Sequence, residues 1–168
     1  MKPLLAIGLG NPLMGDDGVG CAVAERLACD PRLPETTEVI CGGSDLLRYA
    51  GEMEGRQRVV VIDAIQGDTE PGSVEIFEGA LSGLGGEQFS GEQLNDRQLN
   101  EKQDHVHNLS AVQAIRLLRI LKPLRCTLVG ISISSAEFGT NLSPTVAAHM
   151  PAILDNVLQE LSRCSSEQ

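Results

Sequence analysis

The chain has 168 residues, of which 42% are hydrophobic but only 2% aromatic, so we expect one domain with an aliphatic core. The formal net charge of −10 argues against a nucleic-acid partner, because few cationic side chains could neutralise phosphates. No apolar run approaches the ~20 residues that a membrane-spanning helix requires. The five cysteines form no C-x-x-C pair, so we expect a reduced, cytoplasmic protein.

The first feature along the chain is a glycine-rich turn between a strand and a helix. Apolar residues 3–7 predict the strand, residues 19–27 predict the helix, and GLGNPLMGDDGVG occupies residues 8–20 between them. A dinucleotide-binding turn carries glycines at its first, third and sixth positions. Counted from Gly8, the sixth position is Leu13, so the sequence does not match a nucleotide-binding turn.

The end of this turn carries two adjacent carboxylates, Asp16 and Asp17. Negative side chains suit the amino terminus of a helix, but they would repel a phosphate and attract a cation. The turn therefore predicts a metal–carboxylate loop. The alternative is that Asp16 is only an N-cap and Asp17 a solvated residue of the first helical turn.

The later elements alternate between strand and helix patterns. We predict strands over 36–41, 58–65, 73–77 and 126–133, a short helix capped by Ser44, and longer helices over 108–122 and from Ser143 onward. The β-branched run makes 58–65 the central strand, buried on both faces. Pro151 predicts a kink or a restart in the last helix.

Residues 79–104 are rich in Gly, Gln and Glu, so we expect a long mobile loop over 79–105. The alternation of strands and helices predicts a single catalytic domain over 1–168. Its expected fold class is α/β. We predict a three-layer α/β/α sandwich of the phosphorylase/hydrolase type, around a mostly parallel, twisted sheet of about five strands.

Three candidate ligands are predicted at the carboxyl ends of the strands, where sites form in such sheets. Asp17 follows the first strand, Asp63 ends the most buried strand, and His107 precedes the helix that leads to the last strand. Two carboxylates and one imidazole make an open site for a borderline divalent ion. Such an ion can polarise a carbonyl group or lower the pKa of bound water.

Each candidate has a simpler interpretation. Asp63 could cap the following turn, and His107 could be a helix cap. His105 is a competing ligand, and His149 is expected to be structural. Cys41 ends the second strand, so it could be a soft ligand or a thiol nucleophile.

The chain resembles the hydrogenase maturation endopeptidases, the C-terminal processing proteases of the nickel–iron hydrogenase large subunit. The resemblance rests on Gly8-x-Gly10-Asn11, Asp16-Asp17-Gly18-x-Gly20, Gly42-Gly43, Asp63-Ala64, His107, Thr127-Leu128-Val129-Gly130 and Leu142-Ser143-Pro144-Thr145-Val146. It implies an endopeptidase that removes the C-terminal extension of the nickel-loaded precursor. One departure is Cys41, where many relatives have Asp before Gly-Gly.

The resemblance also implies that Asp17, Asp63 and His107 form the metal site and the catalytic set of a metallo-type or aspartic-type peptidase. The metal would be nickel already inserted in the substrate, and other divalent ions could substitute. No Ser-His-Asp or Cys-His-Asn arrangement is evident, so we predict a water nucleophile. The expected partner is the hydrogenase large-subunit precursor, with no nucleic acid and no membrane, and the free protein is expected to be a monomer.

Two alternatives remain open at this point. Peptidyl-tRNA hydrolases, which are esterases, share the string Gly8-Leu9-Gly10-Asn11-Pro12, but they need a nearby His-Asn pair and a basic surface. A non-catalytic, nickel-dependent maturation adaptor could use the same three candidate ligands. Cleavage of a metal-loaded precursor would separate the adaptor from the enzyme.

Overall fold

The computed structural model describes residues 1–67, 69–78, 111, 114–115, 118 and 125–166. In chain order its elements are β1 (Leu4–Leu9), the 3-10 turn η1 (Gly15–Gly18), α1 (Val19–Leu27), β2 (Thr37–Gly43), the 3-10 turn η2 (Leu46–Tyr49), α2 (Ala50–Met53), β3 (Arg58–Gln66), β4 (Val74–Glu78), β5 (Cys126–Ile133) and α5 (Pro144–Ser166). The loop predicted over 79–105 lies outside the described residues.

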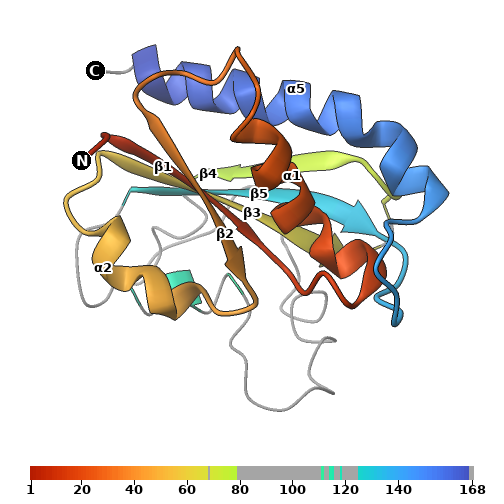
Figure 1. Cartoon of the computed structure of the whole chain (residues 1–168). Helices are drawn as coiled ribbons and strands as arrows, with labels where there is room; N and C mark the ends of the chain where they lie inside the picture. Colours follow the sequence, from red (N-terminus) through yellow and green to blue (C-terminus); the bar gives the residue numbers. More distant parts are fainter. Residues whose placement is uncertain (68, 79–110, 112–113, 116–117, 119–124, 167–168) are drawn as a thin grey trace, which may run out of the picture.

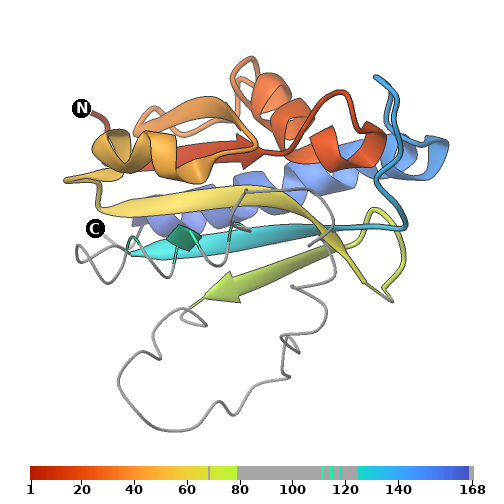
Figure 2. The ribbon, with the colours of Figure 1, turned by 90° about the horizontal axis from the view of Figure 1, so that it is seen from below.

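The described strands form one twisted sheet in the order β2-β1-β3-β5-β4. Neighbouring strands from β2 to β5 run parallel, and β4 pairs with β5 in the antiparallel direction. Figure 2 shows β4 at the edge of the sheet, beside β5. The mostly parallel, five-stranded sheet of the predicted α/β fold is confirmed.

Two hydrophobic clusters cover the two faces of this sheet. Helices α1 and α5 pack on one face, where their apolar side chains meet those of β1, β3 and β5 (Figure 1). On the other face, η2 and α2 pack together with the described helical residues Ala111, Ala114, Ile115 and Leu118. The result is the predicted three-layer sandwich, with an aliphatic core on each side.

The central position of β3 follows from its composition. Val59, Val60, Val61 and Ile62 are each at most 1% exposed, and they alternate between the two clusters. A strand covered by helices on both faces needs apolar residues at odd and even positions alike. The predicted central strand is therefore confirmed, and it carries the site residue Asp63 toward its carboxyl end.

Two local predictions can be compared with the structure. The short helical segment after β2 is capped by Asp45, not Ser44, because Asp45 Oδ1 accepts a hydrogen bond from the backbone N–H of Leu47 at 3.1 Å. Pro151 predicted a kink or a restart, and of these the restart is wrong, because α5 continues through the proline. Its buried residues lie on both sides of the proline and hold both halves of the helix against the sheet.

Among the described residues, no helix combines the length and the hydropathy needed to cross a bilayer.

Candidate active site

Asp63 lies at the point where β3 loses its neighbour β1. The parallel pairing of β1 with β3 ends at Gly8 and Ile62, whereas β3 itself continues to Gln66 beside β5. The sequence had suggested that Asp63 ends this strand. In the structure, Asp63 lies inside β3, three residues before its last residue, Gln66. The half-buried Asp63 is at the first position of β3 that no longer pairs with β1.

The face on which Asp63 lies follows from strand alternation. Val59 and Val61 belong to the cluster beneath η2 and α2, and Asp63 continues that series. The carboxylate accepts a hydrogen bond from the backbone N–H of Ala64 at 2.9 Å. This bond is local to Asp63 and its neighbour in the strand.

Close backbone packing brings the glycine-rich turn to the same edge. A Cβ atom at Gly20 would overlap the carbonyl oxygens of Leu9 and Ile62, so only glycine lets α1 approach both β1 and β3. Gly10 has a φ of +121°, and a Cβ atom there would overlap the carbonyl oxygen of Asp17. The glycines therefore place the Asp-Asp pair close to the carboxyl end of the sheet.

Asp17 lies in η1, and η1 contacts β3. Its Oδ2 accepts a hydrogen bond at 2.9 Å from the backbone N–H of Asn11, and its own N–H donates to the carbonyl of Met14 at 3.1 Å. The N-cap of α1 is Gly18, without a side-chain cap, so neither aspartate of the pair caps that helix. The simpler N-cap interpretation is wrong, and the half-buried Asp17 lies in a turn that contacts the strand carrying Asp63.

Asp16 has a role that the sequence did not reveal. It is 5% exposed, and its Oδ1 accepts a hydrogen bond at 2.6 Å from the backbone N–H of Ser143. Ser143 in turn caps α5, since its Oγ accepts from the N–H of Val146 at 3.3 Å. Asp16 therefore joins the glycine-rich turn to the start of α5 across 127 residues of sequence, a separation that local patterning does not report.

The third predicted ligand, His107, lies outside the described residues, as does the competing ligand His105. The described residues contain no group of three His, Cys, Asp or Glu side chains arranged for a metal ion, so the donor set seen there is the carboxylate pair. Ala111 and Ile115, which follow His107 in the sequence, pack on the face of the sheet to which Asp63 belongs. His149 lies against Gly72, with its Nδ1 2.8 Å from the carbonyl of Thr145, in agreement with a structural role.

Cys41 is exposed at the end of β2, in register with Gly8 of β1. The buried Cys21 thiol of α1 donates to the carbonyls of Gly8 and Gly10, each at 3.5 Å. Burial raises the pKa of Cys21 to about 12, and contact with the Cys41 side chain adds to the rise. Cys21 therefore remains a neutral thiol, which suits packing beneath the turn and not nucleophilic attack.

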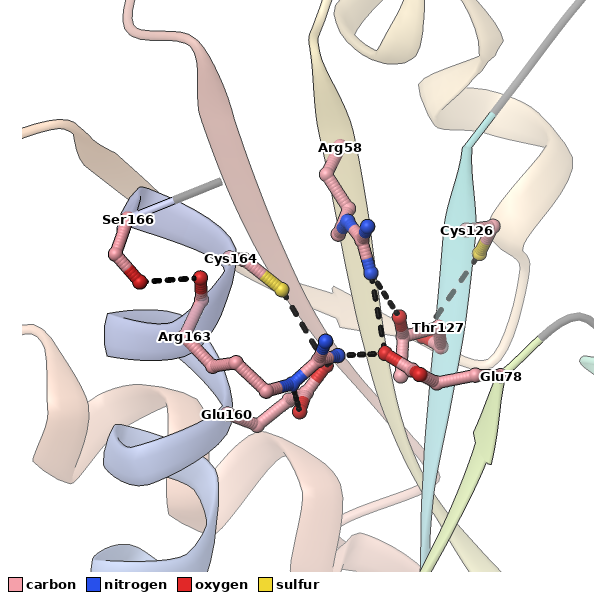
Figure 3. Close-up of polar contacts among 8 residues, drawn as sticks. All are labelled: Arg58, Glu78, Cys126, Thr127, Glu160, Arg163, Cys164 and Ser166. Carbon is pink, nitrogen blue, oxygen red and sulfur yellow. Dashed lines mark hydrogen bonds and ion pairs between the residues drawn. The ribbon is translucent and has the colours of Figure 1, made fainter. Parts of the chain in front are cut away.

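A second polar cluster lies at the opposite end of the sheet (Figure 3). Glu160 of α5, whose side chain is 3% exposed, receives two hydrogen bonds from Arg163, at 3.0 and 2.7 Å. Glu78 of β4 pairs with Arg163 and with Arg58, the first residue of β3. Here each carboxylate faces a guanidinium, so the cluster fastens α5 to β3 and β4 and does not attract a cation.

Comparisons with known proteins relate the chain to hydrogenase maturation proteases. The family model HycI, described as hydrogenase maturation protease, matches residues 21–81. The Escherichia coli hydrogenase 2 maturation protease is 27% identical over 168 aligned residues, covering 98% of this chain and 93% of that protein. A Methanocaldococcus jannaschii protein named as a hydrogenase maturation protease is 40% identical over 76 residues, and that match spans 49% of its length.

Solved structures extend the agreement to the whole fold. The hydrogenase maturating endopeptidase HybD of E. coli superposes with a TM-score of 0.69 at 25% identity, covering 95% of this chain and 92% of that one. The HybD hydrogenase maturation protease of Thermococcus kodakarensis gives a TM-score of 0.65 at 27% identity, covering 94% and 98%. The family model, the relatives and the solved structures all name hydrogenase maturation proteases, and the chain resembles these proteins in sequence and in fold.

Proposed function

We propose that this protein is an endopeptidase that removes the C-terminal extension from the nickel-loaded large-subunit precursor of a nickel–iron hydrogenase. The observation that supports this most directly is the contact between η1, which carries Asp17, and β3, which carries Asp63, in a fold that the maturation proteases share. A relative named as a hydrogenase maturation protease aligns with 98% of this chain.

The two carboxylates have a clear chemical role in this proposal. Each has one oxygen oriented by a backbone N–H, from Asn11 for Asp17 and from Ala64 for Asp63. Carboxylate oxygens are ligands that divalent cations accept in proteins, and these hydrogen bonds orient one oxygen of each side chain. We propose that Asp17, Asp63 and His107 bind the nickel that the precursor brings, and that other divalent ions can substitute.

The cleavage step in this proposal is hydrolysis by water. Water attacks the carbonyl carbon of the scissile peptide bond, the C–N bond breaks, and the leaving amine gains a proton. A carboxylate at the site can orient the water and accept its proton, as in general-base catalysis. Nickel in the substrate would supply polarisation of the scissile carbonyl, and we place the reaction in the cytoplasm.

The alternatives make different predictions. A peptidyl-tRNA hydrolase would need to bind a polyanion, whereas this chain has a net charge of −10 and carries Asp16 and Asp17 in its turn. The comparisons also name maturation proteases throughout. A non-catalytic adaptor would bind the metal-loaded precursor and release it uncleaved.

The decisive experiment incubates the purified protein with a nickel–iron hydrogenase large-subunit precursor from the same source, with and without inserted nickel. We expect mass spectrometry to show loss of a C-terminal peptide only from the nickel-loaded precursor. Binding without cleavage would indicate the adaptor, and equal cleavage of both precursors would refute dependence on nickel. A covalent acyl-enzyme would refute the water nucleophile.

Nickel binding by the protein alone gives a second test. Because the precursor is proposed to bring both the metal and further ligands, we expect equilibrium dialysis to detect only weak binding to the free protein. Nanomolar binding without the precursor would contradict this proposal and would identify nickel as a resident cofactor.

A further inference from the structure

Two large apolar side chains stand exposed beside the candidate site. Phe138 is 86% exposed and Leu13 is 55% exposed, whereas most large apolar residues of the described chain are buried. Phenylalanine is scarce here, with three in 168 residues, and Phe138 gains no free energy from burial within the folded chain, so its apolar surface remains available to a ligand. The other exposed large apolar residues, Met1 and Ile76, lie at the chain terminus and on the edge strand β4.

Backbone pairing places Leu13 and Phe138 next to each other. Met14 and Gly139 form a parallel bridge, in which the N–H of Gly139 donates to the carbonyl of Leu13 at 2.9 Å and the N–H of Gly15 donates to the carbonyl of Gly139 at 2.8 Å. In this register Leu13 lies opposite Phe138 along the two backbone segments. We call these two exposed residues the Leu13–Phe138 patch.

The segment that carries Phe138 is held at both ends. Gly139 is fixed to the glycine-rich turn by the two bonds just described, and Ser143 is fixed by the buried Asp16 carboxylate at 2.6 Å. Figure 1 shows this connection between β5 and α5 running beside the turn that follows β1. The patch is thus preorganised, so a ligand would not need to order it on binding.

The patch is also continuous with the candidate site. Asp17 donates from its backbone N–H to the carbonyl of Met14, the residue that follows Leu13. The turn that presents Leu13 therefore also positions Asp17. A chain lying across the patch would continue directly toward the carboxylates.

We propose that the Leu13–Phe138 patch binds an apolar side chain of the precursor's own C-terminal region, close to the scissile bond. This inference rests on the proposed function and adds the contact that aligns the substrate. A second copy of this chain is a poorer occupant, because stable interfaces bury roughly 800 Å² on each partner and two side chains supply far less. An extended peptide needs only one such anchoring contact beside the reacting bond.

The test compares Phe138→Ser and Leu13→Ser with the wild-type protein, using the nickel-loaded precursor as the probe. Ile76→Ser is the matched control, since Ile76 is 43% exposed on β4, away from the turn. We expect each patch variant to raise KM about tenfold or more, with kcat changed less than about twofold. Phe138→Leu should restore most of the lost affinity, and all melting temperatures should agree with the wild type because the side chains are exposed.

Unchanged KM in both patch variants, or an equal rise in the Ile76→Ser control, would overturn the inference. So would a wild-type dimer in analytical ultracentrifugation that becomes a monomer in Phe138→Ser while precursor cleavage stays normal. Precursor binding is measured separately by biolayer interferometry. If the wild type binds but does not cleave, the proposed activity fails while the loss of binding in the variants still tests the patch; if it neither binds nor cleaves, both proposals fail.

Discussion

The carboxylates at the two ends of the sheet have different hydrogen-bond partners. At the amino end, Glu78 and Glu160 are paired with the guanidinium groups of Arg58 and Arg163. At the carboxyl end, Asp17 and Asp63 accept hydrogen bonds from backbone N–H groups. A guanidinium brings an opposite charge to a carboxylate, whereas a backbone amide brings a hydrogen bond without a formal charge.

This difference separates a structural role from a functional one. A buried carboxylate that is already paired with arginine stabilises the packing it belongs to, and losing its partner is costly. A half-buried carboxylate oriented by the backbone still has oxygen lone pairs to offer a ligand. We therefore expect substitutions at the two ends to have opposite effects on stability and on cleavage.

The largest expected effect is the loss of cleavage in Asp63→Asn. The amide keeps the shape of the side chain but removes the charge that would attract the cation, so kcat/KM should fall by about 100-fold or more. Thermal stability should be equal or higher, because a half-buried charge has been removed. Cleavage assays and thermal melts measure the two effects, and a variant that unfolds or that cleaves normally would show Asp63 to be structural.

Arg163→Met should show the opposite pattern at the amino end. The buried Glu160 would lose two hydrogen bonds and its partner charge, which should lower the free energy of unfolding by ~2–3 kcal/mol. Cleavage should be unchanged at temperatures where the variant is folded. Urea denaturation gives the stability, and Arg163→Lys, which keeps the charge, is the control; reduced kcat/KM in the folded variant would contradict the separation of the two ends.

Asp16→Ala removes a carboxylate that lies at the carboxyl end of the sheet but that holds the start of α5 through its hydrogen bond with Ser143. It leaves the backbone N–H of Ser143 without its buried acceptor, so stability should fall by ~1–2 kcal/mol. The segment that carries Phe138 would lose one of its two attachments, so KM should rise more than kcat falls. Asp16→Asn, whose amide oxygen can still accept the bond, should behave like the wild type, and equal defects in both variants would instead point to the charge.

The smallest effect concerns the two buried thiols, one near each end. Burial raises the pKa of Cys164 from 9.0 to about 11 and that of Cys21 from 9.0 to about 12. Because these pKa values rise on folding, the stability they contribute is complete below pH 9 and is lost as the pH rises toward 11–12. Urea midpoints should therefore fall less steeply above pH 9 in Cys164→Ala than in the wild type, and parallel pH profiles would refute this contribution.

Much of the fold could be predicted from local patterns. The β-branched run of 58–65 predicted the buried central strand, and Ser143-Pro144 predicted the start of the last helix. Local patterns were less reliable at element ends: Asp45 replaced Ser44 as a cap, and α5 continued through Pro151. Both corrections arise from contacts that compete with local preference, since Asp45 reaches the N–H of Leu47 and the sheet supports both halves of α5.

The candidate site was predicted only in part, for a related reason. The residue types of Asp17 and Asp63, and their places after buried strands, are properties of the sequence, and the rules of parallel sheets bring such residues to one edge. The partner of Asp16 is 127 positions away, and the register of Leu13 with Phe138 joins two separate loops. Periodicity reports neighbours within one element, so the chemistry at the sheet edge was evident from the sequence, whereas long-range backbone pairing, visible only in the tertiary structure, decided what holds and flanks it.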